Sequence, residues 1–329
     1  MAERLNLMQQ WLRDELGLSE FTVTPASEDA SFRRYFRVSW ECNTAIIMDA
    51  PPGKEDCAAF IDITARLLQC GVNVPDIRAS NLQLGFLLID DLGTELYLDV
   101  LNQDNAARLY TDAIDSLVRF QDCAETGGLP PYAEKLLRQE MSLFNDWLLG
   151  RHLRIEPTPV TEQQLADVFT LLVDNALQQP GVFVHRDYHS RNLMLNQRNP
   201  GIVDYQDAVY GPVTYDLVSL LKDCYIKWPR VRVLSWLEEF RDKCQLTTAR
   251  NAGADQLLRW FDLMGVQRHL KASGIFARLS HRDNKSGFIG DIPRTLSYIV
   301  DLEPEYPELQ PLTGFIRERV LPGLEERAP

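Results

Sequence analysis

Three oxygen-bearing side chains stand out by their type and spacing in the middle of the chain. Asp187 and Asn192 are separated by four residues in the stretch HRDYHSRN at 185–192, and Asp204 follows after the next apolar run. A carboxylate can accept a proton from a hydroxyl group, and amide and carboxylate oxygens are ligands that Mg²⁺ accepts readily. Phosphoryl transfer needs little more from a protein than such a base and such a metal site. We therefore expect Asp187 to be the base and Asn192 and Asp204 to be the metal ligands.

Short apolar runs flank this polar stretch and indicate how it is held. Residues 182–184 (VFV) predict a buried strand, and residues 193–195 (LML) begin a hairpin that turns at 199–201 and ends at Asp204. The polar side chains would then face one cleft from backbone that is anchored at both ends. The alternative is a polar hairpin loop in which Asp and Asn only cap turns. Under this alternative, the polar loop, the spacing of Asp187 and Asn192, the flanking strands and the downstream Asp204 would all have to occur together by chance.

The motifs resemble those of a known family. The spacing H-R-D-x-x-x-x-N at 185–192 matches the kinase catalytic loop, and G-P-x-x-x-D-L follows at 211–217. On these residues the chain resembles the aminoglycoside phosphotransferase and choline kinase superfamily, small-molecule kinases with a protein-kinase-like fold. The resemblance implies that Asp216 braces the catalytic loop without taking part in the chemistry. Arg186 departs from the family, which usually has Gly there, whereas His189 is typical of small-molecule kinases.

The resemblance implies an α+β fold with two lobes. Residues 1–92 would form a small nucleotide-binding lobe with an antiparallel sheet and a helix, ending in a hinge. Residues 93–329 would form a large, mainly helical lobe that carries the catalytic loop and binds the acceptor substrate. Hydrophobic periodicity agrees, because strand patterns are confined largely to 21–49 and 77–89. Helical patterns cover residues 3–17, 55–69, 103–123, 131–149, 165–177, 215–224, 231–244 and 256–279.

Nucleotide contacts follow from the same resemblance. The loop at 28–33 (EDASFR) lacks the glycines of a kinase phosphate loop, but its backbone amides and an arginine could still bind phosphate. Residues 90–93 (DDLG) would form the hinge whose backbone binds adenine. An ordinary hairpin loop and an acidic turn without a ligand are the respective alternatives. The expected nucleotide contacts are Ala30, Ser31, Arg33, Asp90, Asp91, Leu92 and Met194.

The third expected strand departs from the kinase pattern. Kinases place a lysine there that binds the α- and β-phosphates, whereas this chain has Met48 at the matching position. Arg33, Arg34 and Lys54 are nearby cations that could replace the lysine, and we favour Arg33. An inactive kinase would also lack this lysine, but the complete base and metal ligands argue against one.

The overall composition argues against some classes of protein. The chain of 329 residues carries 34 basic and 47 acidic side chains, a net charge of -13, which disfavours non-specific nucleic-acid binding. No apolar run approaches the length of a membrane span, and the N-terminus has no cleavage-site pattern, so we expect neither a membrane segment nor a signal peptide. The six cysteines form no C-x-x-C motif, and we expect reduced thiols in a cytoplasmic protein. The sequence leaves the oligomeric state open.

Basic residues recur at helical spacing towards the end of the helix expected at 256–279. If the helix continues, they fall within an arc of roughly 100°. They are Arg268, Lys271, Arg278, Arg282 and Lys285. A solvated basic face is one interpretation. The other follows from the resemblance, because this region lines the acceptor pocket in the superfamily. Arg268 and Lys271 would then contact an anionic group of the substrate.

Four segments narrow the resemblance: DASFRRYFRV at 29–38, AIIMDAPP at 45–52, HRDYHSRNL at 185–193 and GVQRHLK at 265–271. They are similar to bacterial anomeric sugar kinases of the N-acetylmuramate/N-acetylglucosamine type, over nearly the whole chain. This similarity implies that ATP, with Mg²⁺, phosphorylates the C1 hydroxyl of either sugar to the α-1-phosphate. The pathway would be peptidoglycan recycling towards UDP-N-acetylmuramate, which bypasses the step that fosfomycin blocks. The implied sugar contacts are His189, Arg191, Arg268 and Lys271.

Two rival functions remain at this point. A kinase of the same fold could act on an aminoglycoside or a choline-like alcohol. The net charge of -13 suits such a cationic substrate, but the basic residues near the expected acceptor pocket do not. A nucleotide-binding regulatory module without turnover belongs to a different class, and a transfer assay separates it from an enzyme.

Overall fold

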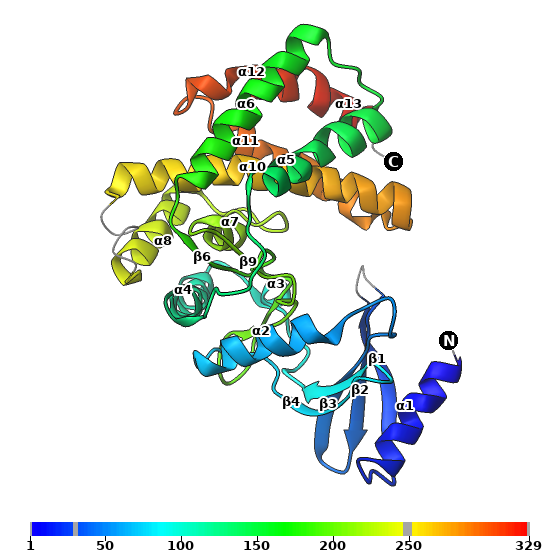
Figure 1. Cartoon of the computed structure of the whole chain (residues 1–329). Coiled ribbons are helices and arrows are strands. Elements are labelled where there is room, and N and C mark those ends of the chain that lie inside the picture. The colour runs from blue at the N-terminus through cyan, green and yellow to red at the C-terminus, as the bar shows by residue number, and fades with distance from the viewer. Residues whose placement is uncertain (1, 29–31, 246–251, 328–329) are drawn as a thin grey trace. The chain divides into compact units, whose positions relative to one another are not determined.

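The computed structural model describes residues 2–28, 32–245 and 252–327 (Figure 1). The chain falls into two compact units. The first comprises Met1–Leu96 together with Leu193–Asp207, and the second comprises Tyr97–Asn192 together with Ala208–Pro329. The first is built on an antiparallel sheet and the second is mainly helical, which confirms the α+β class. In the described part of the chain, no helix is both long and apolar enough to cross a membrane.

The first unit is organised around an antiparallel sheet in the order β1-β2-β3-β5-β4. Side chains alternate between the faces of a strand. Val38, Ala45 and Ile47 are buried in one cluster with residues of α1, whose Trp11 stacks on Phe86 with 5.8 Å between ring centroids. The main elements are α1 (Ala2–Asp14), β1 (Thr22–Glu28), β2 (Arg34–Trp40), β3 (Asn43–Asp49), α2 (Cys57–Gln69), β4 (Ile77–Asn81) and β5 (Phe86–Asp90). The three strands expected within 21–49 and the two expected within 77–89 are confirmed.

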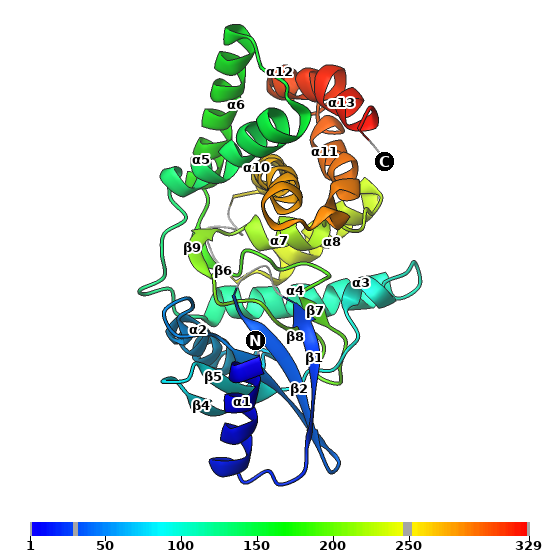
Figure 2. The ribbon, with the colours of Figure 1, turned by 90° about the vertical axis from the view of Figure 1, so that its right-hand side faces the viewer.

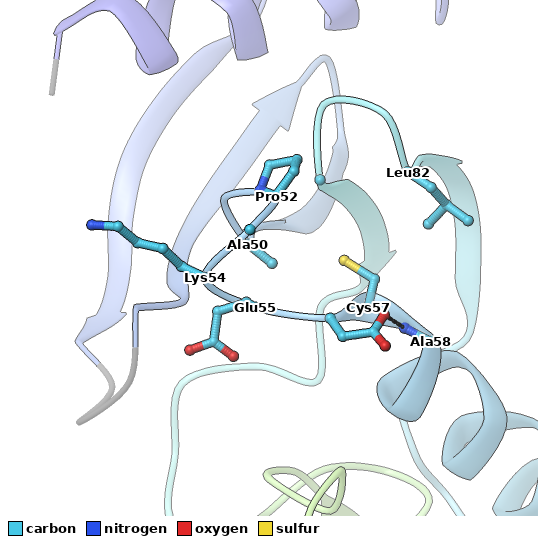
Figure 3. Close-up of a pocket in the computed structure, with 10 residues that line it drawn as sticks. Ala50, Pro52, Lys54, Glu55, Cys57, Ala58 and Leu82 are labelled. Carbon is cyan, nitrogen blue, oxygen red and sulfur yellow. Dashed lines mark hydrogen bonds between the residues drawn. The ribbon is translucent and has the colours of Figure 1, made fainter.

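The connection from β3 to α2 depends on a close approach of two backbone segments. The Ala50 amide donates to the Gly85 carbonyl oxygen at 2.8 Å. Gly85 has a φ of +71°, and a Cβ there would lie 1.9 Å from the Ala50 carbonyl oxygen, so only glycine fits. The same connection, with Gly85 and Leu82, lines a pocket of about 520 Å³ (Figure 3). Lys54, one of the candidate phosphate cations, lies at this pocket.

A short hairpin completes the first unit. β7 (Leu193–Met194) pairs with β8 (Gly201–Ile202), as the apolar runs after the catalytic loop predicted. The amide of Leu195 donates to the carbonyl oxygen of Glu95 at 2.8 Å, and the amide of Ile202 donates to that of Asn73, also at 2.8 Å. These bonds attach the hairpin to the unit that contains the sheet.

The long helix α10 (Ala254–Asp283) forms the centre of the second unit; Figure 1 shows it from the side and Figure 2 nearly end-on. It packs against α5, α6, α7 and α11. A Cβ on Gly274 would lie 2.3 Å from the carbonyl carbon of Leu143, so α10 passes very close to the end of α5. The other helical segments are α3 (Tyr97–Val100), α4 (Ala106–Cys123), α5 (Glu134–Leu143), η1 (Phe144–Leu153), α6 (Pro159–Leu177), α7 (Tyr215–Leu221), α8 (Arg230–Lys243), η2 (Ser286–Asp291), α11 (Ile292–Val300), η3 (Pro307–Leu309), α12 (Gln310–Phe315), η4 (Ile316–Val320) and α13 (Leu321–Glu325). β6 (Gly181–Val184) pairs with β9 (Val209–Pro212).

The basic residues of α10 do not form one solvated face. Arg268 and Lys271 are 5 % and 7 % exposed, whereas Arg282 is exposed, and the helix ends at Asp283, before Lys285. The interpretation as one solvated face is therefore wrong for Arg268 and Lys271, which are buried. Helical spacing places side chains on one side of a helix, but it does not tell which part of that side other elements cover.

The cysteines differ in state from the expectation of six reduced thiols. Four are free: Cys42, Cys57, Cys224 and Cys244. Cys70 and Cys123 are disulfide-bonded. Both lie at helix ends, Cys70 as the C-cap of α2 and Cys123 as the last residue of α4. The spacing of cysteines along the chain gave no sign of this difference.

Asp49 supplies a test of what stabilises the first unit. Its carboxylate is buried, and it accepts hydrogen bonds from Nε of Arg4 at 2.8 Å and from Nε of Arg34 at 3.1 Å. We expect Asp49→Asn to lower the free energy of unfolding by about 2 kcal/mol, since both guanidinium groups lose a charged acceptor. The matched change is Asp62→Asn, which breaks the exposed pair between Asp62 and Arg66 and should cost less than about 0.5 kcal/mol. Equal losses in urea unfolding would contradict the structural role of Asp49.

Candidate active site

A buried carboxylate anchors the loop that carries Asp187. Asp216 lies in the first turn of α7 and is fully buried. Its Oδ2 accepts a hydrogen bond from the backbone amide of His185 at 2.7 Å, and its Oδ1 accepts one from the backbone amide of Arg186 at 2.9 Å. One carboxylate thus fixes two consecutive peptide groups directly before Asp187.

Arg186 adopts a backbone conformation that favours glycine. Its φ is 79°, in the left-handed region, which costs a residue with a side chain about 1–2 kcal/mol. The guanidinium group donates to Oε1 of Glu140 at 2.6 Å and lies 6.0 Å from the ring centroid of Tyr132. This left-handed conformation explains why the superfamily that the chain resembles usually has Gly at this position. In this chain the contacts of the side chain offset the backbone strain.

Backbone and amide hydrogen bonds close the loop on itself. The backbone amide of His189 donates to the carbonyl oxygen of Asp187 at 3.1 Å, and Nδ2 of Asn192 donates to the same oxygen at 2.9 Å. The backbone amide of Asn192 donates to the carbonyl oxygen of His189 at 2.9 Å. Since the Asn192 amide nitrogen is directed to the loop, its oxygen is the atom that could ligate a cation.

Asp223 holds the other side of the loop, and the sequence did not predict this. Its Oδ2 accepts hydrogen bonds from the backbone amide of Ser190 at 3.0 Å and from the Ser190 hydroxyl at 2.6 Å. Its Oδ1 accepts one from the backbone amide of Tyr225 at 2.9 Å. The available signal was a charged pair, Lys222 and Asp223, within a run of apolar residues, which indicates buried partners.

Two basic residues of α10 lie near the loop, in different environments. Nζ of Lys271 is 3.1 Å from Oε1 of Glu140 and donates to the hydroxyl of Tyr215 at 2.9 Å. Arg268 has only a weak acceptor among the described residues, Sγ of Cys224 at 3.5 Å, and its buried Nε has no hydrogen-bond partner there. The positive charge of Lys271 is therefore balanced by the carboxylate of Glu140. The buried positive charge of Arg268 has no such partner among the described hydrogen bonds and ion pairs.

These cations determine the protonation of Asp187. Burial alone would raise the pKa of its carboxyl group. The positive charges of Lys271, His189 and Arg268, with a smaller contribution from Arg186, lower the pKa of Asp187 to about 2. The carboxylate is therefore ionised throughout the physiological range and can accept a hydrogen bond from a hydroxyl group.

The first unit contains Asp204 and Met194. Asp204 follows β8 with a φ of 64°, and its Oδ1 accepts a hydrogen bond from Nε2 of Gln206 at 2.9 Å. Met194 lies in β7, where it pairs with Gly201 and is 9 % exposed. Asp204 therefore lies in the unit with the sheet, and Asp187 and Asn192 lie in the other unit.

The other expected nucleotide contacts also belong to the first unit. The carboxylate of Asp90 accepts from Nε of Arg78 at 2.6 Å, and that of Asp91 accepts from Arg37 at 2.7 Å and 3.0 Å. The carbonyl oxygen of Leu92 accepts from Asn196 at 3.4 Å. These two carboxylates therefore hold the segment in place through side-chain bonds. Ala30 and Ser31 lie outside the described residues.

Met48 and the cations considered as replacements for the kinase lysine can also be placed. Met48 is buried in β3 and pairs with Tyr35 and Leu87. Nε of Arg34 donates to Oδ2 of Asp49, and Nζ of Lys54 lies 4.6 Å from the ring centroid of Phe32. Arg33 is 9 % exposed, with its guanidinium group 4.0 Å from Oδ2 of Asp207.

Comparison with known proteins assigns the family. The model of the phosphotransferase enzyme family matches residues 22–252. The chain belongs to this family. It is 45 % identical over 326 residues to an N-acetylmuramate/N-acetylglucosamine kinase of Pseudomonas putida, with 96 % of each chain covered. A kinase of the same name from Pseudomonas aeruginosa is 48 % identical, covering 88 % of this chain and 86 % of its own. The solved GDP complex of aminoglycoside 2'-phosphotransferase-IIIa is 14 % identical, with a TM-score of 0.61 over 89 % of this chain and 98 % of that one.

The chain is thus a phosphotransferase, and the expected protein-kinase-like fold is confirmed. Within the second unit of this phosphotransferase, the structure brings Asp187 together with His189, Asp216, Arg268 and Lys271. The His189 ring lies edge-on to Tyr225, with 5.5 Å between centroids. Burial lowers the pKa of His189, although the nearby carboxylates of Asp223 and Asp187 oppose this.

The buried Asp216 gives the phosphotransferase a pH-dependent stability. Burial raises the pKa of Asp216 to about 7, although the backbone hydrogen bonds from His185 and Arg186 oppose this. Between about pH 4 and pH 7 the folded chain then binds more protons than the unfolded chain, so ionisation of Asp216 lowers stability as the pH rises. We expect the stability difference between wild type and Asp216→Asn to grow as the pH falls from 7 to 4. Urea unfolding at several pH values measures it, and a difference independent of pH would contradict the assignment.

Proposed function

We propose that this phosphotransferase transfers the γ-phosphoryl group of ATP, with Mg²⁺, to the C1 hydroxyl of N-acetylmuramate and of N-acetylglucosamine. The product is the α-1-phosphate. The observation that carries the proposal is the 45 % identity to the Pseudomonas putida kinase over 96 % of both chains. The active-site loop supports it, because it holds an ionised carboxylate among cations. An aminoglycoside acceptor is less well supported, since that similarity is 14 % in sequence and concerns the fold alone.

Asp187 acts as the base in this proposal. Its pKa of about 2 makes it a weak base, which suits a loose transition state in which proton transfer comes late. An anomeric hydroxyl is more acidic than an ordinary alcohol, so a carboxylate suffices to accept its proton. Asn192 and Asp204 would hold Mg²⁺, which would supply positive charge to the phosphates. Asp187 thereby orients the hydroxyl, and the metal ligands orient the phosphate.

The nucleotide contacts also belong to the proposal. The first unit would bind ATP through the backbone at 90–92, beside Met194, and through Ala30, Ser31 and Arg33. Arg33 is favoured as the replacement for the kinase lysine, since Arg34 is bonded to Asp49. Nucleotide binding by residues 1–92 and sugar binding by residues 93–329 would then be separate tasks of the two lobes.

The proposed reaction suggests a pathway. A sugar α-1-phosphate is the substrate class for a uridylyl transfer, which would give UDP-N-acetylmuramate without its early synthetic steps. Peptidoglycan recycling, bypass of the step that fosfomycin inhibits and a cytoplasmic location, where ATP is available, are parts of this proposal. The rival interpretation as a non-catalytic module loses its support, because the family and the near relatives are kinases.

A transfer assay tests the acceptor. Wild-type protein with ATP and Mg²⁺ is given N-acetylmuramate, N-acetylglucosamine, kanamycin or choline in separate reactions. We expect phosphate transfer to the two sugars only, and a product whose phosphate is released in mild acid because it lies on the anomeric carbon. An acid-stable product, or transfer only to kanamycin or choline, would reject the proposed acceptor.

Replacement of the base tests the mechanism. We expect Asp187→Asn to lower kcat on both sugars by about 10²- to 10⁴-fold, since the amide cannot accept the proton. ATP binding, measured by calorimetry, should stay within about threefold of wild type, because no contact to the nucleotide is assigned to this side chain. The matched surface change Asp174→Asn should leave kcat unaltered. Near-normal turnover of Asp187→Asn would remove Asp187 as the base.

A further inference from the structure

Three aromatic rings lie together beside the catalytic loop within the second unit. Phe276 of α10 and Phe288 of η2 stack with 5.6 Å between ring centroids and 14° between planes. Tyr225, which follows α7, lies 6.0 Å from Phe276 and 6.4 Å from Phe288. The rings come from three separate segments, so they form a platform that depends on the tertiary fold.

Arg191 of the catalytic loop lies against two of these rings. Its guanidinium carbon is 4.9 Å from the ring centroid of Tyr225 and 5.1 Å from that of Phe288. We call Tyr225 and Phe288 the aromatic clamp. The Arg191 side chain is exposed and makes no hydrogen bond or ion pair with any residue in the described parts of the chain. Contact with aromatic rings restrains an arginine side chain, while its N–H donors need acceptors elsewhere.

Arg191 is more accessible than the other cations near the loop. Lys271 is bonded to Glu140 and Tyr215, and Arg268 is 5 % exposed behind Cys224. The sequence favoured Arg268 and Lys271 as contacts to an anionic group, but the described contacts favour Arg191 for this role. Arg268 instead acts through its field, which lowers the pKa of Asp187.

We infer that Arg191, held by the aromatic clamp, binds the lactyl carboxylate of N-acetylmuramate and thereby selects the acidic sugar. This inference rests on the proposed function. A guanidinium group presents paired donors that match a carboxylate in two parallel hydrogen bonds. N-acetylglucosamine lacks the carboxylate and therefore gains nothing from Arg191. The same loop then supplies the base for C1 and the cation for the lactyl group.

Three acceptors separate the charge of the lactyl group from its size. They are N-acetylmuramate, its neutral lactyl amide and N-acetylglucosamine, each assayed for kcat and KM with ATP and Mg²⁺. The wild type should use N-acetylmuramate about 10- to 100-fold better than the amide in kcat/KM, the loss expected when a charged pair is removed. Arg191→Ala should lose the same factor on N-acetylmuramate, mainly through KM. On N-acetylglucosamine it should change less than about threefold.

Two further variants give the clamp its own test. Phe288→Leu removes one ring and should reduce kcat/KM on N-acetylmuramate alone, by less than Arg191→Ala does. Arg232→Ala is the matched control. The guanidinium carbon of Arg232 lies 5.1 Å from the ring centroid of Trp228, which precedes α8, and 5.7 Å from that of Trp236, which lies on α8. This control removes an arginine with similar packing and should leave the ratio of the two sugars unchanged.

The outcomes separate the inference from the proposed function. Three results for Arg191→Ala would overturn the role of Arg191 and leave the sugar kinase activity intact. They are equal losses of kcat/KM on both sugars, a higher KM for ATP, and a preference for N-acetylmuramate over its amide that equals that of the wild type. If the wild type phosphorylates neither sugar, the proposed function itself is wrong. Thermal unfolding of Arg191→Ala and Arg191→Lys identifies a loss that comes from misfolding, and Arg191→Lys should recover part of the preference for N-acetylmuramate.

Discussion

The two hydrogen bonds that Asp216 accepts from consecutive backbone amides are the constraint on which the active-site loop depends. They set the path of the chain at His185 and Arg186, and with it the position of Asp187. The turn forces Arg186 into the left-handed region, so its side chain must find compensation, which Glu140 supplies. A buried carboxylate is an expensive anchor, since burial raises its pKa to about 7. The hydrogen bonds from the amides of His185 and Arg186 oppose this rise in pKa and so offset part of the cost of burial.

Glu140 has a second effect, on the charge around Asp187. It is buried and interacts with Arg186, Lys271 and the hydroxyl of Tyr132. Two of the cations near Asp187 are thereby neutralised locally, while Arg268 keeps a charge with little compensation. Burial raises the pKa of Asp187, but the charges of Lys271, His189 and Arg268 still lower it to about 2. A base of that kind is ionised under all physiological conditions but binds a proton weakly. It therefore contributes by orienting the acceptor hydroxyl, which is what a loose phosphoryl transition state requires.

Local patterns in the sequence predicted the elements and the chemical residues, but not the groups that hold them. Asp187 and Asn192 belong to one short motif, and strand and helix periodicity is also local, so both could be inferred. Glu140 is 46 positions from Arg186, and Asp223 is 33 positions from Ser190. Such pairs form only when the tertiary fold brings distant segments together. The burial of Arg268 and Lys271 on α10 could not be inferred for the same reason, because it depends on the elements that pack against this helix.

The arrangement of the loop separates chemistry from selectivity. Asp216 fixes the position of Asp187 through the backbone amides of His185 and Arg186. These bonds do not involve the side chain at position 191. Arg191 is placed by Tyr225 and Phe288, and the backbone amide of Tyr225 donates to Asp223, which also holds Ser190. Changes at 191 or 288 can therefore alter the charge presented to an acceptor without moving the base. A family with one fold and a common loop motif could in this way diversify its acceptors, since the anchor of the base and the platform for the substrate are different parts of the structure.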